Sequence, residues 1–154
     1  MIGSRDVQLM QVAISLAMSA EREGNLPIGA VIALDGEVIA RGQNSIWRPG
    51  TALTRHAEME ALRSVPEELW ARSGTMALYT TLEPCVMCAG AILLHRIGRL
   101  VFGSSDPYGG VGQSLSSLPP YFQERLSLCQ WVGPMLPEEC DRLYMRIQEL
   151  EDRR

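Results

Sequence analysis

Apolar residues recur every three to four positions near the start of the chain, at Val7, Met10, Ile14, Ala17 and Met18. This spacing predicts an amphipathic helix over residues 5–23, closed by a Gly-Asn pair. Polar side chains interrupt the same run, which favours a packed helix over an export signal. No apolar stretch approaches the ~18 residues of a membrane-spanning helix, so no membrane partner is expected.

Strand-like and helix-like patterns alternate along the rest of the chain. The pair Asp35-Gly36 is a hairpin signal that separates two strand-like runs, residues 27–34 and 37–42. Further strands are predicted over residues 75–82, 100–103 and 128–132, and further helices over residues 56–64, 84–95 and 137–151. Because strands alternate with helices, the expected class is an α/β sandwich around a central sheet.

Length and composition are those of a globular domain. The chain has 154 residues, of which 46% are hydrophobic and 21% charged, and residues 1–154 are predicted to form a single domain. Four cysteines fit a reducing cytoplasm better than a disulfide scaffold. Cys129 and Cys140 are expected to be buried thiols.

The net charge and the distribution of basic residues indicate whether the partner is a polynucleotide or a small molecule. The net charge is −4, and all 14 basic residues are arginines. A domain that holds a polynucleotide mainly through phosphate contacts usually carries a basic patch. Arg41, Arg48 and Arg55 could form such a patch, or they could be solvated arginines scattered over a mildly acidic surface. The acidic balance and the missing lysines therefore favour a small-molecule partner.

Two short motifs carry the candidate chemistry, His-Ala-Glu at positions 56–58 and Pro-Cys-Val-Met-Cys at positions 84–88. The three ligands His56, Cys85 and Cys88 suit one Zn²⁺ ion and leave its fourth position open for water. Zinc lowers the pKa of bound water towards roughly 7, and Glu58 could move protons from that water to a departing amine. The pattern is typical of zinc-dependent nucleobase deaminases.

A Cys-x-x-Cys pair by itself is also found in structural zinc sites and redox pairs. A closed structural site needs a fourth ligand, and the candidates His95, Cys129 and Cys140 belong to no second paired motif. His95 is instead expected at a helix C-terminus. A redox pair leaves His56 and Glu58 unexplained. The combination therefore favours an open, catalytic zinc site.

The predicted elements also place these groups. His56 begins one predicted helix, while Cys85 and Cys88 lie in the first turn of another. Two helix N-termini would then converge on one point, and their positive ends would favour thiolates and hydroxide.

Three stretches carry a resemblance to a known family: Thr-Leu-Glu-Pro-Cys-Val-Met-Cys-Ala-Gly-Ala at 81–91, Arg-Ile-Gly-Arg-Leu-Val-Phe-Gly at 96–103, and Leu-Pro-Ile-Gly-Ala-Val at 26–31. With them the chain resembles the cytidine deaminase-like superfamily, and most closely its bacterial tRNA adenosine deaminase branch. The resemblance implies a three-layer α/β/α sandwich with a central mixed five-stranded sheet, a homodimer and one zinc ion per chain. It implies that His56, Cys85 and Cys88 hold the zinc and that Glu58 moves protons.

The same resemblance implies the substrate contacts. Asn44 and the backbone near Ala57 and Cys85 would orient the substrate ring, and Pro27 in the matching first strand is assigned to the same site. Trp47 could line the pocket, or it could lie at the surface or at a dimer interface.

The loop that contains Asp106 and Tyr108 allows two interpretations. Near a pocket mouth, Asp106 could accept hydrogen bonds from a sugar or an amine, and Tyr108 could stack on a ring. The alternative is a glycine-rich loop with an Asp-Pro turn and an exposed tyrosine.

The chain departs from the tRNA branch at three places. The run Leu53-Thr54-Arg55 replaces the usual Pro-Thr-Ala before His-Ala-Glu, Tyr108 stands where that loop usually has a lysine, and the C-terminal helix is acidic. Each departure removes positive charge or alters the pocket mouth, and none touches the zinc motif.

Three functions follow. The favoured one is a hydrolytic deaminase that converts an amino group on a free nucleobase, nucleoside or related heterocycle to a carbonyl and releases ammonia. The second is a tRNA adenosine deaminase, which the match around Cys85 favours and the charge pattern disfavours. The third is a non-catalytic zinc- or RNA-binding module, which has no use for Glu58.

Overall fold

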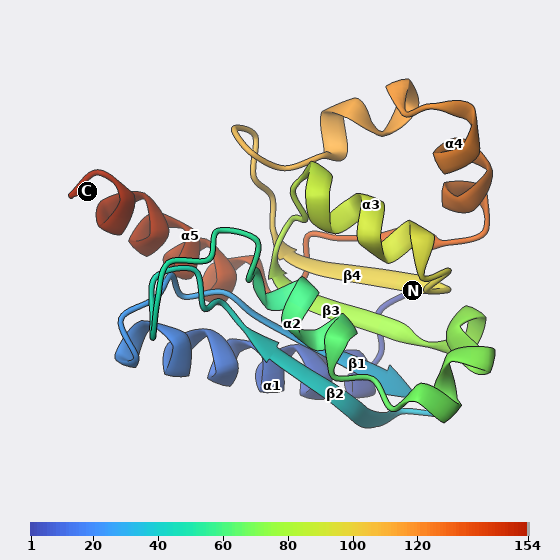
Figure 1. Ribbon diagram of the computed structural model, residues 1–154, viewed down its shortest axis with the longest axis horizontal. Coiled ribbons are helices and arrows are strands. Elements are labelled where there is room, and N and C mark those ends of the chain that lie inside the picture. Colours follow the sequence, from blue (N-terminus) through green and yellow to red (C-terminus); the bar gives the residue numbers. More distant parts are fainter. Residues whose placement is uncertain (154) are drawn as a thin grey trace.

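A five-stranded mixed sheet with the strand order β2-β1-β3-β4-β5 forms the centre of the computed structural model, which describes residues 1–153 (Figure 1). The strands are β1 Gly29–Leu34, β2 Glu37–Gln43, β3 Ala77–Leu82, β4 Arg99–Ser104 and β5 Gln130–Val132. β1 pairs antiparallel with β2 and β3, whereas β3 with β4 and β4 with β5 are parallel. The predicted mixed five-stranded sheet is confirmed.

Helices cover both faces of the sheet. They are α1 Ser4–Arg22, α2 Ala57–Arg63, α3 Val86–Leu94, α4 Pro120–Ser127 and α5 Pro137–Glu151, with two 3₁₀ segments, η1 Glu67–Thr75 and η2 Gly112–Ser117. Neighbouring strand residues divide between two apolar clusters: Val31 packs with α1 and the start of α5, while Ile32 packs with α2 and α3. This alternation follows from the period of two in a strand. Figure 1 shows the resulting three layers, with α1 on the opposite side of the sheet from α2 and α3.

The predicted hairpin is present between β1 and β2. Asp35 and Gly36 have φ values of 52° and 79°. Positive φ at both central residues is the geometry that two-residue hairpin turns favour, and aspartate followed by glycine tolerates it best.

The structure corrects several element boundaries. The helix predicted over residues 84–95 begins at Val86, because Cys85 is the extended residue that caps it. The strand predicted from Thr75 begins at Ala77, because the 3₁₀ segment η1 continues through Thr75. The sequence prediction missed α4, although a proline at the first helical position is typical of helix starts.

Two glycines allow helices to approach the sheet closely enough to build the site. A Cβ atom at Gly42 in β2 would overlap the backbone of Ala57 and Ala61 in α2. A Cβ atom at Gly103 in β4 would overlap the side chain of Cys140 in α5. The absence of a side chain at these positions therefore sets the positions of α2 and α5.

Within residues 1–153, no helix has the length and apolar character required to cross a membrane.

Candidate active site

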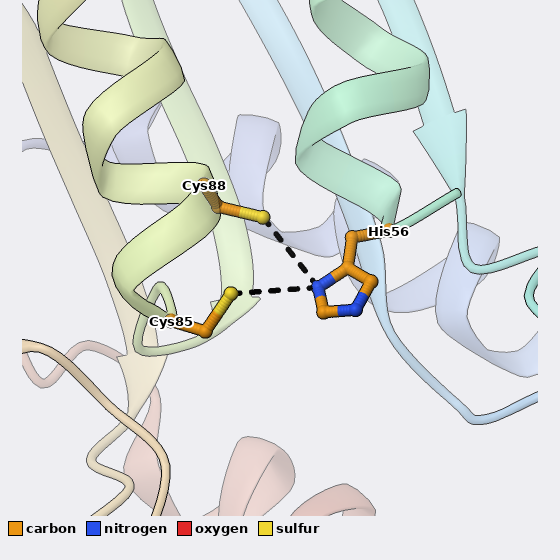
Figure 2. Close-up of side chains that lie close together, drawn as sticks. All are labelled: His56, Cys85 and Cys88. Carbon is orange, nitrogen blue, oxygen red and sulfur yellow. Dashed lines mark hydrogen bonds between the residues drawn. The ribbon is translucent and has the colours of Figure 1, made fainter. Parts of the chain in front are cut away.

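Two helix starts bring three candidate metal ligands together. His56 is the N-cap residue of α2, Cys85 is the N-cap residue of α3, and Cys88 lies in the first turn of α3. The Sγ atoms of Cys85 and Cys88 lie 3.6 and 3.5 Å from Nδ1 of His56 (Figure 2). All three ligand atoms lie within 4.8 Å of one another. The placement predicted from the sequence is confirmed.

This geometry fits a zinc ion. Sulfur and nitrogen ligands at tetrahedral zinc, about 2.3 and 2.0 Å from the metal, are about 3.5 Å apart. The separations between His56 and each of Cys85 and Cys88 match that value. Among residues 1–153, no fourth His, Cys, Asp or Glu joins the group. The three residues could therefore hold a zinc ion with one position left for another ligand.

The pKa values of the three candidate ligands also fit a metal site. A hydrogen bond from Cys88 and the nearby His56 outweigh the effect of burial and lower the pKa of the Cys85 thiol to about 4. The pKa of Cys88 is raised, because it donates that hydrogen bond and is buried. The hydrogen bond with Cys85 raises the pKa of His56. Metal binding would displace the proton that the two thiols share, as zinc–thiolate binding generally does.

Glu58 is a buried carboxylate beside these ligands. Its side chain is 4% exposed, and it lines the same cavity as His56 and Cys85. Thr80 donates a hydrogen bond to Oε1 across 3.1 Å, and Oε2 lies 3.5 Å from Sγ of Cys88. Burial raises the pKa of the Glu58 carboxyl group. Glu58 thus lies next to the metal group without belonging to it.

A cavity of about 290 Å³ opens beside these groups. Its lining comprises Leu26, Ile28, Asn44, Ile46, His56, Glu58, Leu82, Glu83, Cys85, Asp106, Tyr108, Gly109, Tyr144, Ile147, Gln148 and Glu151. Asn44 is 1% exposed, and its Oδ1 accepts a hydrogen bond from the amide of Ile46 at 3.4 Å. Its side-chain nitrogen donates to no group in residues 1–153, so it is available to a ligand.

The loop after β4 forms the mouth of the cavity. Oδ1 of Asp106 accepts hydrogen bonds from the amides of Tyr108 and Gly109 at 3.0 and 2.9 Å. The amide of Asp106 donates to Glu83 at 2.8 Å. Tyr108 is 98% exposed. The loop therefore forms an Asx turn with an exposed tyrosine, as in the second of the two interpretations of the sequence. Asp106 and Tyr108 also line the cavity, as the first interpretation requires.

The structure does not bring every predicted substrate residue to the cavity. Pro27 and Ala57 are buried, and neither is among the lining residues; Leu26 and Ile28 occupy that wall instead. Trp47 packs against the core and lines a different cavity with Asn25 and Glu21.

Sequence reasoning missed the wall formed by α5. This wall consists of Tyr144, Ile147, Gln148 and Glu151. Their spacing of three, four and seven residues places them on one face of a helix, and that pattern was visible in the sequence.

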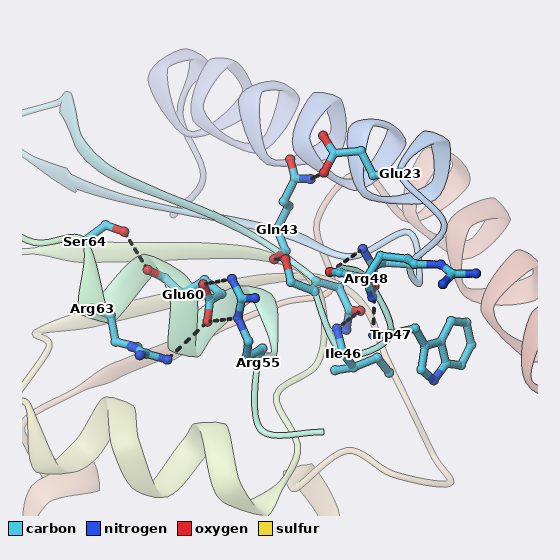
Figure 3. A network of polar contacts seen from close by, with 12 residues as sticks. Glu23, Gln43, Ile46, Trp47, Arg48, Arg55, Glu60, Arg63 and Ser64 are labelled. Carbon is cyan, nitrogen blue, oxygen red and sulfur yellow. Dashed lines mark hydrogen bonds and ion pairs between the residues drawn. The ribbon is translucent and has the colours of Figure 1, made fainter. Parts of the chain in front are cut away.

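Other candidate residues have structural partners. Arg55 forms an ion pair with Glu60 at 3.0 Å, and Arg63 contacts the same carboxylate at 3.5 Å (Figure 3). Arg55 is therefore not a free cation for a basic patch.

His95 is the C-cap residue of α3, as predicted. Cys129 and Cys140 are buried free thiols, also as predicted.

The α/β sheet, the His-Cys-Cys group and the adjacent buried glutamate define the chain as a zinc-dependent deaminase. The zinc-binding region of cytidine and deoxycytidylate deaminases matches residues 4–104, and the chain belongs to this family. A tRNA-specific adenosine deaminase from Bacillus subtilis is 40% identical over 140 residues, which cover 89% of this chain and 84% of the relative. One from Haemophilus influenzae is 40% identical over 141 residues, covering 89% and 79%.

Solved structures agree with this assignment. A structure from studies of A-to-I editing by tRNA:A34 deaminases superposes with a TM-score of 0.73 at 35% identity, covering 89% of this chain and 99% of the other. A guanine deaminase from Nitrosomonas europaea superposes with a TM-score of 0.70 at 19% identity, covering 97% and 85%. At that identity the second likeness shows the fold alone.

Proposed function

We propose that the protein is a tRNA adenosine deaminase that converts an anticodon adenosine to inosine. The supporting observation is the 40% identity over 140 residues to a tRNA-specific adenosine deaminase, which extends over 84% of that relative. The preference for a small-molecule substrate, drawn from the acidic charge balance, receives no support from the relatives. The acidic composition affects how tightly RNA is held and leaves the chemistry unchanged.

In this proposal His56, Cys85 and Cys88 hold one zinc ion per chain. A bound zinc ion would supply a water molecule that is acidic enough to act as a nucleophile at neutral pH. The chain's task is to keep three ligands in a fixed arrangement and the remaining position open. The N-cap positions of His56 and Cys85 do this, because each is fixed by the first turn of a packed helix.

Glu58 is assigned the proton transfers. The net reaction adds one water, breaks the bond between the ring carbon and the exocyclic amine, forms a carbonyl and releases ammonia. Glu58 would take a proton from the attacking water to the ring nitrogen and then deliver a proton to the departing amine. Its buried position beside the ligands and its hydrogen bond from Thr80 hold the carboxylate in one place for both transfers.

The cavity would receive a base that has left the RNA stack. Enzymes that modify a base act on a flipped or unpaired nucleotide, which enters a closely fitting pocket. Asn44 has a free side-chain nitrogen in the cavity and would donate to the ring. Asp106 and Tyr108 at the mouth would contact the sugar and a neighbouring base.

A substrate comparison tests the proposal. We expect the purified protein to release ammonia and form inosine from an anticodon stem-loop with adenosine at the wobble position, and not from the same stem-loop with guanosine there. Free adenosine, cytidine and guanine are tested in parallel as small-molecule substrates. Turnover of a free base or nucleoside with none of the stem-loop would overturn the tRNA assignment and leave the deaminase assignment intact.

We also propose that residues 1–154 act as one domain, in the cytoplasm, as a homodimer. The support for the dimer is the outer face of α3, where Val86 and Leu94 are 71% and 54% exposed. Light scattering should give twice the mass of 17.0 kDa. Leu94→Glu should shift the protein towards the monomer, whereas Met18→Glu on α1 should not. A monomeric wild-type protein would contradict the proposal.

A further inference from the structure

Tyr144 in α5 connects the C-terminal helix to the loop at the mouth of the cavity. Its hydroxyl donates a hydrogen bond to Oδ1 of Asp106 across 2.9 Å, although the two residues are 38 positions apart in the chain. Both side chains line the cavity. Burial and the neighbouring carboxylate raise the pKa of Tyr144 to about 12, so the hydroxyl remains a donor at neutral pH.

The two oxygens of Asp106 have different surroundings. Oδ1 accepts three hydrogen bonds, from the amides of Tyr108 and Gly109 and from the Tyr144 hydroxyl. Oδ2 accepts none from residues 1–153. The backbone of the loop is held separately, because the amide of Asp106 donates to Glu83 at 2.8 Å. The carboxylate is thus anchored through one oxygen and has the other available.

The helix that carries Tyr144 is itself attached to the sheet and to α1. Ser104 at the end of β4 donates a hydrogen bond to Asp141, one turn before Tyr144. Arg146 forms an ion pair with Glu21 of α1. These contacts hold α5 on both sides of Tyr144, so the position of its hydroxyl is set by the fold rather than by the loop.

We propose that Tyr144 is a positioning residue that orients Asp106 so that Oδ2 accepts a hydrogen bond from a hydroxyl or amino group of the substrate. The proposal rests on the proposed function only for the identity of that substrate. Tyr144 acts on binding through Asp106 and takes no part in the transfer of protons, which is assigned to Glu58.

The variant Tyr144→Phe keeps the ring and removes only the hydroxyl. With the anticodon stem-loop as substrate, we expect KM to rise roughly fivefold, as for the loss of one hydrogen bond, and kcat to change less than twofold. Tyr121→Phe removes the same group from an exposed tyrosine of α4 and should leave both constants unchanged. An unchanged KM in Tyr144→Phe, or a fall in kcat alone, would overturn the proposal.

A double-mutant cycle separates an effect through Asp106 from a general loss of packing. In an Asp106→Ala background, Tyr144→Phe should raise KM no further. If the effects of the two substitutions on KM multiply, Tyr144 acts independently of Asp106 and the proposal is wrong. Zinc content and melting temperature show whether each variant is folded. If Asp106→Ala is not folded, the KM of Tyr144→Phe alone tests the proposal.

Hydrogen exchange provides a readout that needs no substrate. The amides of Tyr108 and Gly109 should exchange faster in Tyr144→Phe than in the wild type, because the Asp106 carboxylate that they bind loses its hydrogen bond from Tyr144. Unchanged exchange would refute the positioning role. A wild-type protein that does not deaminate the stem-loop would refute the tRNA assignment instead, so the two failures are distinguishable.

Discussion

The hydroxyl of Thr80 donates a hydrogen bond to a carboxylate oxygen of Glu58 across 3.1 Å, and both side chains are buried. Thr80 belongs to β3 and Glu58 to the first turn of α2, so this contact connects the central sheet to the group assigned to proton transfer. A rigid strand therefore limits the orientations that the carboxylate can adopt.

Glu58→Gln removes the proton carrier and keeps the shape of the side chain. We expect the rate of ammonia release to fall roughly 10³-fold, within the range for loss of a general acid–base group. Zinc content should stay at one ion per chain, since Glu58 lies outside the ligand group. Glu124→Gln on the exposed side of α4 is the matched control and should keep full activity. Normal turnover by Glu58→Gln would refute the assigned role.

Thr80→Val replaces the hydroxyl with a methyl group of similar size. Because the Glu58 carboxylate loses a donor that fixes one oxygen, we expect kcat to fall roughly fivefold. Thr75→Val, at an exposed position before β3, should have no effect on kcat. Equal activity in both variants would show that Thr80 does not orient Glu58.

Cys85→Ala removes one of three metal ligands. We expect the purified variant to lose its zinc and its activity, because two remaining ligands hold the ion weakly. The melting temperature should also fall, since metal bound to the native state stabilises it. Cys129→Ala removes a buried cysteine elsewhere and should keep one zinc per chain. Elemental analysis that finds full zinc occupancy in Cys85→Ala would contradict the ligand assignment.

The metal group could be predicted from the sequence because its parts are local. The His-Ala-Glu motif and the Cys-x-x-Cys motif each lie within about one helical turn, so the side chains of each motif must lie close together wherever the helix packs. The hairpin at Asp35-Gly36 was predictable for a similar reason, since two adjacent residues determine the turn.

The position of the α5 wall in the cavity could not be predicted in the same way, although the spacing of its residues shows that they share one face of a helix. The contact between Tyr144 and Asp106 depends on where α5 packs, and that depends on the close approach of Cys140 to Gly103. No local pattern reports such an approach. Arg55 shows the same limit, because its ion pair with Glu60 depends on the turn before α2, which no helical spacing specifies.

Asp6 should make the stability depend on pH in the acidic range. Burial disfavours the charged carboxylate, but hydrogen bonds from Arg99, Tyr79 and the Gly3 amide outweigh this and lower its pKa to about 2. A carboxyl group with a lowered pKa stabilises the fold above its ordinary pKa of 3.8, and this contribution is lost as the pH falls towards 2.

Asp6→Asn should therefore lower the free energy of unfolding by about 2 kcal/mol at pH 7 and by less at pH 3. Denaturant unfolding at both values measures the difference. Asp35→Asn changes a carboxylate that is 68% exposed and should have a small effect at both. An equal loss at pH 7 and pH 3 for Asp6→Asn would show that the charge of Asp6 does not contribute.

Gly42→Ala should disturb the metal group from a distance. A Cβ atom there would overlap the backbone of Ala57 and Ala61, so α2 must move away from β2 and carry His56 with it. We expect a loss of more than about 2 kcal/mol in stability, as for overpacking, together with weaker zinc binding. Gly50→Ala adds the same methyl group where nothing lies within 4 Å and should keep both properties. Zinc affinity and stability that are unchanged in Gly42→Ala would mean that the contact between α2 and β2 does not position His56.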